Sequence, residues 1–350
     1  MSVGRGRNRF VPLSPLRSGA VRTWVLDESP GSYRFGELAD PEPGPGEVRV
    51  RVVASALNHM DIWVTKGLPE PPVPHVPGAD GAGVVERLGD GVVGVAVGDE
   101  VVLDPSLSCG RCSACLAGEQ PLCPSFGILG EHHWGTHGEY AVVPERNVVA
   151  KPVGRTWEEA AAYGLCAVTA WRMLRRARLR AGETLLVVGV GGGVSSMGTV
   201  LGVAMGAEVV VTSRDEAKRA AAIGLGAAAA YDSADERWPV KADVVLENVG
   251  RPTWDKSLRS LKPGGRLVTC GGTGGTTVEL SIPRLFFKQH EIIGSTMGSH
   301  REFEEVTALV ERGLPVPVDA VHDLEEFPAA LARLDAGQQF GKLVLRHPSP

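Results

Sequence analysis

The hydrophobic pattern of the chain changes character near residue 155. Before that point, short valine-rich runs at 83–87, 100–103 and 140–143 are separated by Gly and Pro. Another run, from Glu47 to Ala54, alternates charged and apolar residues, which is typical of a half-exposed strand. The first part of the chain is therefore predicted to be mostly β, with little helix.

Beyond residue 155 two periodicities alternate. Helical spacing at 157–163 and 169–178 is followed by strand-like runs at 184–188, 208–212, 227–231, 243–247, 266–270 and 291–295. Helical stretches such as 214–223 and 253–261 lie between most of these runs, so a parallel sheet with crossover helices is predicted. Two helices, 301–312 and 327–336, and a strand at 341–346 complete the chain, and we expect this segment to return to the first domain.

A glycine-rich turn lies between the strand from Thr184 and the next predicted helix, which runs from Ser195 to Met205. Glycines at such a turn let a nucleotide pyrophosphate approach the backbone, and the following helix N-terminus offers unpaired N–H groups to the anion. Ser195 stands where the fingerprint has its third glycine. The sequence thus predicts a dinucleotide site at Gly189, Gly191, Gly192, Gly193 and Val194.

Composition narrows the class of protein. The 350 residues are enough for two hydrophobic cores, and 43% of them are apolar, as in a soluble globular protein. A net charge of −5 argues against a nucleic-acid partner. No apolar run reaches the roughly 18 residues of a membrane span outside glycine-rich turns, so no membrane association is predicted.

The first twenty residues contain four arginines and no acidic residue, without the apolar core of a secretory signal. They suit either a targeting or anion-binding tail or a disordered extension, and we predict a disordered extension, with folding from Val21. Four of the six cysteines crowd into 109–123, which is too tight for a secreted disulfide framework. A reducing cytoplasmic location is predicted.

These four cysteines are Cys109, Cys112, Cys115 and Cys123, in SCGRCSACLAGEQPLC. Four thiolates on one loop can surround Zn²⁺ tetrahedrally and leave no coordination position for a substrate. One structural zinc is therefore predicted, stabilising a lobe with little core of its own. Free or oxidised cysteines and an iron–sulfur cluster are the alternatives.

Several segments give the chain from about Val21 onward a resemblance to the medium-chain dehydrogenase/reductase family, which contains alcohol dehydrogenases and quinone reductases. They are PGPGEVRVRV at 43–52, ALNHMDIWVTKG at 56–67, PGADGAGVVERLG at 77–89, GDEVV at 98–102, LCAVTAW at 165–171 and FGKLVL at 340–345. The resemblance implies an α/β protein: a β-rich GroES-like catalytic domain at 21–154 with a zinc lobe at about 105–125, a Rossmann domain at 155–297 and a C-terminal return at 298–350. It also implies hydride transfer in the cleft between the domains.

The chain departs from the zinc alcohol dehydrogenases at the catalytic metal. Asn58 replaces their first cysteine ligand, and Ala79 stands in the segment that supplies a second ligand, whereas Cys166 keeps a thiol at the third position. Alanine cannot bind a metal and an amide is a poor zinc ligand. Met60 replaces the hydroxyl that begins their proton relay. A site rebuilt from His59, His75, His132, His133, His137 or Asp80 is the alternative, although no such spacing is visible.

Without a metal, the favoured substrates are those that delocalise the charge left by hydride addition, namely quinones, enones and other activated alkenes. Asn58 and His59 are then the predicted donors to the substrate oxygen, and His59 is a candidate proton donor. His59 could instead touch a cofactor phosphate, and Asp61 is predicted to be a structural hydrogen-bond acceptor. Asn58, His59 and Cys166 are the predicted catalytic residues.

The end of the second Rossmann strand predicts the cofactor. An acid there would bind the ribose hydroxyls of NAD, but here Ser213, Arg214 and Lys218 follow, which suits the 2′-phosphate of NADP(H) over NAD(H). By resemblance, the nicotinamide side of the cleft is lined by Thr169, Gly271, Gly272 and Thr296. A homodimer or homotetramer is expected by the same analogy, through the segment 293–297.

Three functions compete at this point. The first is an NADPH-dependent oxidoreductase that acts on a small-molecule quinone, enone or related alkene with one structural zinc. The second is an alcohol dehydrogenase whose catalytic zinc has unconventional ligands. The third is a non-catalytic NADPH-binding protein.

Overall fold

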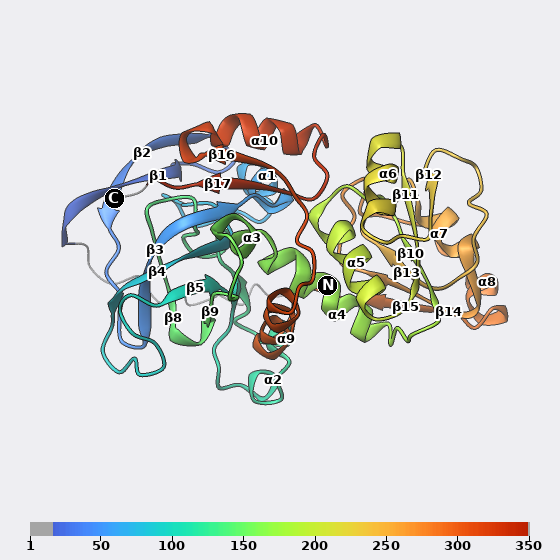
Figure 1. The fold of residues 1–350 in the computed structure, drawn as a ribbon, viewed down its shortest axis with the longest axis horizontal. Helices are drawn as coiled ribbons and strands as arrows, with labels where there is room; N and C mark the ends of the chain where they lie inside the picture. The colour runs from blue at the N-terminus through green and yellow to red at the C-terminus, as the bar shows by residue number, and fades with distance from the viewer. Residues whose placement is uncertain (1–16, 349–350) are drawn as a thin grey trace, which may run out of the picture.

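The computed structural model describes residues 17–348, which form two large β-sheets side by side (Figure 1). The first sheet has the order β16-β17-β3-β4-β5-β9, with β8 paired to β3. Its strands are β3 (Glu47–Ala56), β4 (Asp80–Leu88), β5 (Glu100–Leu103), β8 (Tyr140–Pro144), β9 (Val148–Ala150), β16 (Val318–Asp323) and β17 (Lys342–Arg346). Pairing is antiparallel except between β16 and β17. This is the GroES-like β domain that the sequence predicts.

The second sheet is parallel throughout, with the order β12-β11-β10-β13-β14-β15. Its strands are β10 (Thr184–Val187), β11 (Glu208–Ser213), β12 (Ala229–Asp232), β13 (Ala242–Glu247), β14 (Leu261–Thr269) and β15 (Glu291–Gly294). The chain starts at β10, runs outward to β12 and crosses back to β13, so the strand order reverses beside β10. In such sheets the ligand crevice lies at the carboxyl ends of the strands at this reversal. The predicted Rossmann architecture is confirmed.

Helices accompany both sheets. They are α1 (His59–Thr65), α2 (Ser113–Leu116), α3 (Trp157–Ala162), α4 (Gly164–Arg176), α5 (Gly193–Ala204), α6 (Glu216–Gly224), α7 (Trp254–Ser260), α8 (Ile282–Phe287), α9 (His300–Glu311) and α10 (Phe327–Asp335). The 3₁₀ turns are η1 (Gln120–Leu122), η2 (Glu145–Asn147) and η3 (Leu324–Glu326), and β6 (Ser106–Leu107) pairs with β7 (Gly127–Ile128) beside the cysteine lobe. In Figure 1, α4 and α9 lie between the two sheets.

The C-terminal segment lies on the first sheet, where Figure 1 shows β16, β17 and α10 in red above the blue strands. Strand β17 pairs antiparallel with β3, with Val344 opposite Ala56. Phe327 of α10 and Leu343 of β17 are buried in one cluster with Trp24. This packing places the first residue of β17, Lys342, against the loop that precedes α1.

The N-terminal prediction needs a correction. Strand β1 (Arg17–Leu26) begins four residues before the predicted start at Val21 and pairs with β2 (Tyr33–Asp40), Ala20 lying opposite Ala39. Residues 17–20 therefore belong to a hairpin and not to a disordered extension, because β2 supplies backbone partners that local composition does not reveal. The rest of that predicted extension, residues 1–16, lies outside the described residues.

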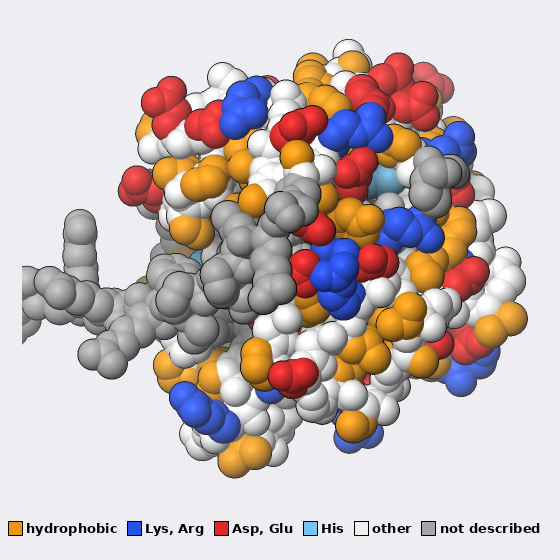
Figure 2. Space-filling view, turned by 90° about the vertical axis from the view of Figure 1, so that its left-hand side faces the viewer, with side chains coloured by type: hydrophobic (Ala, Val, Ile, Leu, Met, Phe, Trp, Pro, Cys, Tyr) orange, Lys and Arg blue, Asp and Glu red, His pale blue; other side chains and the backbone are white. Residues whose placement is uncertain are grey.

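Two further observations concern the helices and the surface of the described residues. No helix among residues 17–348 combines the length and the apolar content needed to cross a membrane. Figure 2 views the end of the molecule formed by the first sheet, and in the visible coloured part acidic and basic side chains are interspersed.

Candidate active site

A cleft of about 1300 Å³ is lined by residues of both sheets. The first domain contributes the loop before α1 and α1 itself, with Asn58, His59 and Trp63. The Rossmann domain contributes the glycine turn after β10 and the ends of β11, β13 and β14. The cleft thus coincides with the strand-order reversal, where a dinucleotide is expected.

The glycine turn has the geometry of a phosphate cradle. Gly189 and Gly191 have φ angles of 72° and 143°, which side chains of L-residues rarely adopt. A Cβ on Gly191 would lie 2.8 Å from Cδ of Lys218, whereas one on Gly192 would meet no atom within 4 Å and would fill open cleft. Helix α5 begins at Gly193 without a side-chain cap, so its first N–H groups face an anion site. These residues fit a dinucleotide pyrophosphate.

Ser195 can stand at the third glycine position because its hydroxyl forms hydrogen bonds with neighbouring residues. Its Oγ lies 3.3 Å from the carbonyl oxygen of Val188 and accepts a hydrogen bond of 3.1 Å from Nδ2 of Asn248. The hydroxyl of Ser195 therefore links α5 to the ends of β10 and β13, whereas a glycine at this position would only permit close packing.

The cleft brings together nearly all of the predicted cofactor residues. Its lining includes Thr169, Gly189, Gly191, Gly192, Gly193, Val194, Ser213, Arg214, Lys218, Gly271 and Thr296. Gly272 is the exception. A Cβ there would lie 2.8 Å from the carbonyl oxygen of Gly275, so Gly272 shapes the loop after β14 and does not line the cleft.

Two further features mark the end of the cleft where the adenosine is expected. Asp215, which weakens a phosphate site by its charge, is the N-cap of α6 and accepts a hydrogen bond of 3.2 Å from the backbone N–H of Lys218. Lys256 also lines this end, although sequence reasoning missed it, and its Nζ donates to the carbonyl oxygen of Ser233 at 2.6 Å. Arg214 is exposed, and Arg219 instead donates to the carbonyl oxygen of Ser213.

At the other end of the cleft, the side chain of Asn58 is fully engaged. Its Nδ2 donates to Oδ2 of Asp80 at 3.0 Å, and its Oδ1 accepts from Nζ of Lys342 at 2.7 Å. The thiol of Cys166 lies 3.4 Å from the same Oδ1. These bonds hold the amide in place, and they occupy the donor that we expected to face a substrate oxygen.

Lys342 lies at the centre of this group. Besides Asn58, its ammonium donates to the carbonyl oxygen of Leu57 at 2.7 Å and to Oδ2 of Asp80 at 2.8 Å, and it lies 3.8 Å from Sγ of Cys166. Lys342 and Asp80 are 3% and 0% exposed. Burial lowers the pKa of Lys342, but the charge of Asp80 and the hydrogen bond to its carboxylate outweigh burial, and the pKa is raised. The lysine is therefore charged at neutral pH.

With Lys342 in place, this position holds a side-chain cation among the candidate ligand atoms. Ala79 is buried among apolar side chains and offers no ligand atom, and burial raises the pKa of the Cys166 thiol to about 11. The ammonium of Lys342 also engages Asp80, one of the alternative ligands considered above. Sequence reasoning missed Lys342 because its partners are far away in the chain, although the FGKLVL segment contained it.

The histidines within residues 17–348 belong to no group with metal-site geometry. Among residues 17–348, the cysteines of the lobe form the sole group of three or more His, Cys, Asp or Glu side chains with metal-site geometry. Nε2 of His75 lies 2.9 Å from the carbonyl oxygen of Gly130, and Nδ1 of His137 lies 2.9 Å from Oγ of Ser55, both in buried surroundings. Asp61 is buried and accepts from the backbone N–H groups of Asn58 and Gly78, at 2.8 and 3.1 Å.

Two titratable side chains line the cleft beside Trp63. His59 is the first residue of α1, and burial, together with the charge of Lys342, lowers its pKa, so it is neutral at pH 7. Glu131, which sequence reasoning did not single out, has its pKa raised to about 7 by burial and by the charge of Asp61. Glu131 can therefore take up or release a proton in the cleft near neutral pH, whereas His59 presents a neutral imidazole.

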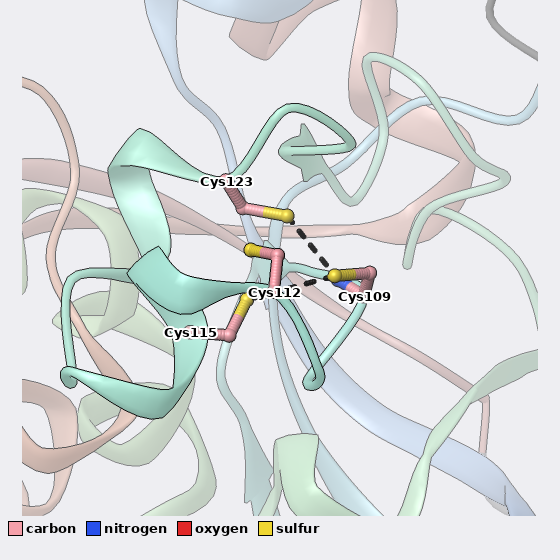
Figure 3. A group of neighbouring side chains, drawn as sticks. All are labelled: Cys109, Cys112, Cys115 and Cys123. Carbon is pink, nitrogen blue, oxygen red and sulfur yellow. Dashed lines mark hydrogen bonds between the residues drawn. The ribbon is translucent and has the colours of Figure 1, made fainter.

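The cysteine lobe forms a closed site away from the cleft (Figure 3). The Sγ atoms of Cys109, Cys112, Cys115 and Cys123 all lie within 4.8 Å of one another. Backbone N–H groups of Arg111 and Cys112 lower the pKa of Cys109 to about 6, which favours the thiolate that a metal needs. The four sulfurs suit tetrahedral Zn²⁺, and their geometry matches the predicted structural zinc site.

A GroES-like β domain, a Rossmann sheet with a phosphate cradle and a four-cysteine lobe together define a nicotinamide-dependent oxidoreductase. Residues 44–153 match the alcohol dehydrogenase GroES-like domain and residues 193–312 match the zinc-binding dehydrogenase family. The chain belongs to the medium-chain dehydrogenase/reductase superfamily and is an NAD(P)-dependent enzyme of the alcohol dehydrogenase and enoyl reductase type.

Similar proteins include both kinds of enzyme. Acryloyl-coenzyme A reductase of Metallosphaera sedula is 33% identical over 320 residues, which cover 89% of this chain and 96% of the relative. The crystal structure of an NAD-dependent alcohol dehydrogenase is 40% identical, with a TM-score of 0.89 and coverage of 93% and 99%. A 2-octenoyl-CoA carboxylase reductase, solved with NADP and 2-octenoyl-CoA, is 28% identical, with a TM-score of 0.87 and coverage of 94% and 88%.

Proposed function

We propose that this enzyme uses NADPH to reduce a quinone, an enone or another activated alkene without a catalytic metal. The observation that carries the proposal is the ligand position itself, where Asn58, Ala79 and the ammonium of Lys342 replace a metal-binding set. α,β-Unsaturated thioesters, the substrate class named for two of the similar proteins, belong to the same chemical group.

The bound nicotinamide would supply the hydride. Hydride addition to a conjugated alkene delocalises the negative charge as an enolate or quinolate, so hydrogen-bond donors can replace a Lewis acid. Neutral His59 supplies one N–H within the cleft and is our candidate for the donor to the substrate oxygen. Asn58 and Cys166 form part of the wall of the site and lie in contact with each other. The bonds of Asn58 to Asp80 and Lys342 hold its amide in one orientation.

The test is NADPH oxidation over a panel of quinones, enones, α,β-unsaturated thioesters, aldehydes and plain ketones, with zinc measured on the same sample. We expect turnover of the conjugated substrates and about one zinc per chain, the number that the cysteine lobe holds. Two zinc ions per chain, with activity on alcohols or plain ketones that a chelator removes, would favour a zinc alcohol dehydrogenase. Tight NADPH binding without turnover of any substrate would favour a binding protein.

The preference for NADPH is proposed from Ser213, Arg214 and Lys218, which line one end of the cleft beside Lys256. Removing a charged donor to a phosphate costs about 1.5–3 kcal/mol. We therefore expect Arg214→Ala to lower kcat/KM for NADPH by about tenfold or more and to leave the value for NADH unchanged.

Arg219→Ala is the matched control for this experiment. Its guanidinium donates to the carbonyl oxygen of Ser213 and pairs with Asp232, so its loss should affect both cofactors equally. A wild-type enzyme that uses NADH as well as or better than NADPH would refute the preference.

A further inference from the structure

The buried Lys342 ammonium does not belong to the hydride chemistry described above, yet it occupies the centre of the first-domain side of the cleft. Three oxygen atoms surround it at 2.7–2.8 Å: the carbonyl oxygen of Leu57, Oδ1 of Asn58 and Oδ2 of Asp80. These three bonds use all three N–H groups of an ammonium. The lysine therefore has no remaining donor for a substrate unless one of them breaks.

The same oxygen atoms, with a thiol beside them, are donors that also bind divalent cations. A carboxylate, an amide carbonyl and a backbone carbonyl suit Ca²⁺, Mn²⁺ and Co²⁺, and the thiolate adds affinity for Co²⁺ or Zn²⁺. Sγ of Cys166 lies 3.8 Å from Nζ of Lys342, on the same centre. The ammonium of Lys342 distinguishes this group of donors from a metal site. Its positive charge repels a second cation, and its hydrogen bonds satisfy the acceptor oxygens.

Covalent attachment keeps the occupant in place. Lys342 is the first residue of β17, and the preceding Gly341 donates its N–H to the carbonyl oxygen of Gly191 at 2.9 Å. The aliphatic stem passes the start of α5, where a Cβ on Gly193 would lie 3.0 Å from Cδ of Lys342. Because the ammonium is tethered, it competes for these oxygen atoms intramolecularly, at an effective concentration set by its short side chain.

We propose that Lys342 is a built-in cation that keeps divalent metals out of the active site, and that the group formed by Leu57, Asn58, Asp80 and Cys166 is a latent metal site that opens when the lysine side chain is removed. This inference rests on the proposed metal-free function. It assigns the lysine as the cause of the metal-free state proposed above.

The experiment compares the full-length wild type with Lys342→Ala, which vacates the centre of the site and keeps its oxygen donors. Both proteins retain zinc in the cysteine lobe, and Co²⁺ is titrated while the near-ultraviolet thiolate-to-cobalt charge-transfer band is recorded. We expect Lys342→Ala to bind one additional cobalt equivalent with that band, at least about tenfold more tightly than the wild type.

Three further variants locate the ion. Lys342→Ala combined with Cys166→Ser should lose the charge-transfer band, and Lys342→Ala combined with Asp80→Asn should lose the affinity. Lys262→Ala removes another Lys–Asp pair, at 2.7 Å from Asp243 and more exposed, and should behave as the wild type does. Circular dichroism and NADPH binding show whether each variant is folded.

The outcomes separate this inference from the proposed function. A wild type with one zinc and a folded Lys342→Ala that takes up no cobalt would overturn the latent site and leave metal-free catalysis standing. A wild type that binds a second ion as tightly as Lys342→Ala would overturn both. A band that persists when Cys166 is replaced would place the cobalt in the cysteine lobe and also overturn the inference.

Discussion

The Lys342–Asp80 pair makes a quantitative prediction about folding stability. In Lys342→Met the carboxylate of Asp80 stays buried with its opposite charge removed, although it still accepts from Leu165 N at 2.6 Å and from Asn58 Nδ2 at 3.0 Å. Methionine has a similar length and leaves little room for a metal ion. Removing one member of a buried ion pair costs about 3–5 kcal/mol, since the remaining charge is desolvated without compensation.

The double variant Lys342→Met with Asp80→Asn buries no net charge, so it should lose less than the two single variants together. A coupling free energy of about 1–3 kcal/mol between the two sites is expected for side chains in direct contact. The control pair is Lys262 and Asp243, with side chains 41% and 24% exposed, for which the corresponding loss is about 0–1 kcal/mol.

The assay is equilibrium unfolding in urea at pH 7 for the wild type, the two single variants and the double variant, with zinc content verified in each. Unchanged m-values would show that the change in midpoint reports native-state stability. A loss below about 1 kcal/mol for Lys342→Met, or single losses that simply add, would refute the view that this pair is a buried and mutually dependent unit.

The remaining predictions concern three other sites. Gly193→Ala places a Cβ 2.4 Å from Sγ of Cys166 and should destabilise the protein by about 1–3 kcal/mol in urea unfolding; Cys166→Ala in the same chain should recover part of that loss, and no recovery would contradict the packing argument. Cys112→Ser should release the zinc of the lobe and expose residues 105–125 to limited proteolysis, and full zinc retention would count against the four-cysteine site. The pKa of Glu131 is raised from 4.5 to about 7, so the protein loses stability as pH rises from 4.5 through 7. Glu131→Gln should therefore raise the free energy of unfolding by about 1–3 kcal/mol at pH 8 and leave it unchanged at pH 4. An equal gain at both pH values would assign the effect to packing.

Features set by neighbouring residues were predictable from the sequence. The glycine turn, its flanking strand and helix and the parallel sheet follow from local periodicity and from the φ angles that glycine alone adopts readily. The sequence spacing of the four cysteines was enough to predict that their sulfur atoms cluster, because a short loop can bring them together without contacts from the rest of the fold.

Features set by residues that are distant in the chain were not predictable from the sequence. The strand pattern at 17–20 has meaning only beside β2, and Gly272 falls outside the cleft because of how its own loop packs. Asn58 was predicted to be a donor facing the substrate, yet its amide is engaged by Asp80 and Lys342.

The active-site cation shows the difference most clearly. By itself, the sequence predicted, from its resemblance to the zinc alcohol dehydrogenases, that two metal ligands are replaced, at Asn58 and Ala79, because each replacement is visible at one position. Only the tertiary structure decided what fills the space, since Lys342 is separated by 284 residues from Asn58 and by 262 from Asp80. A lysine in a strand is expected to reach solvent unless a partner compensates its burial, and here the fold supplies that partner when β17 pairs with β3.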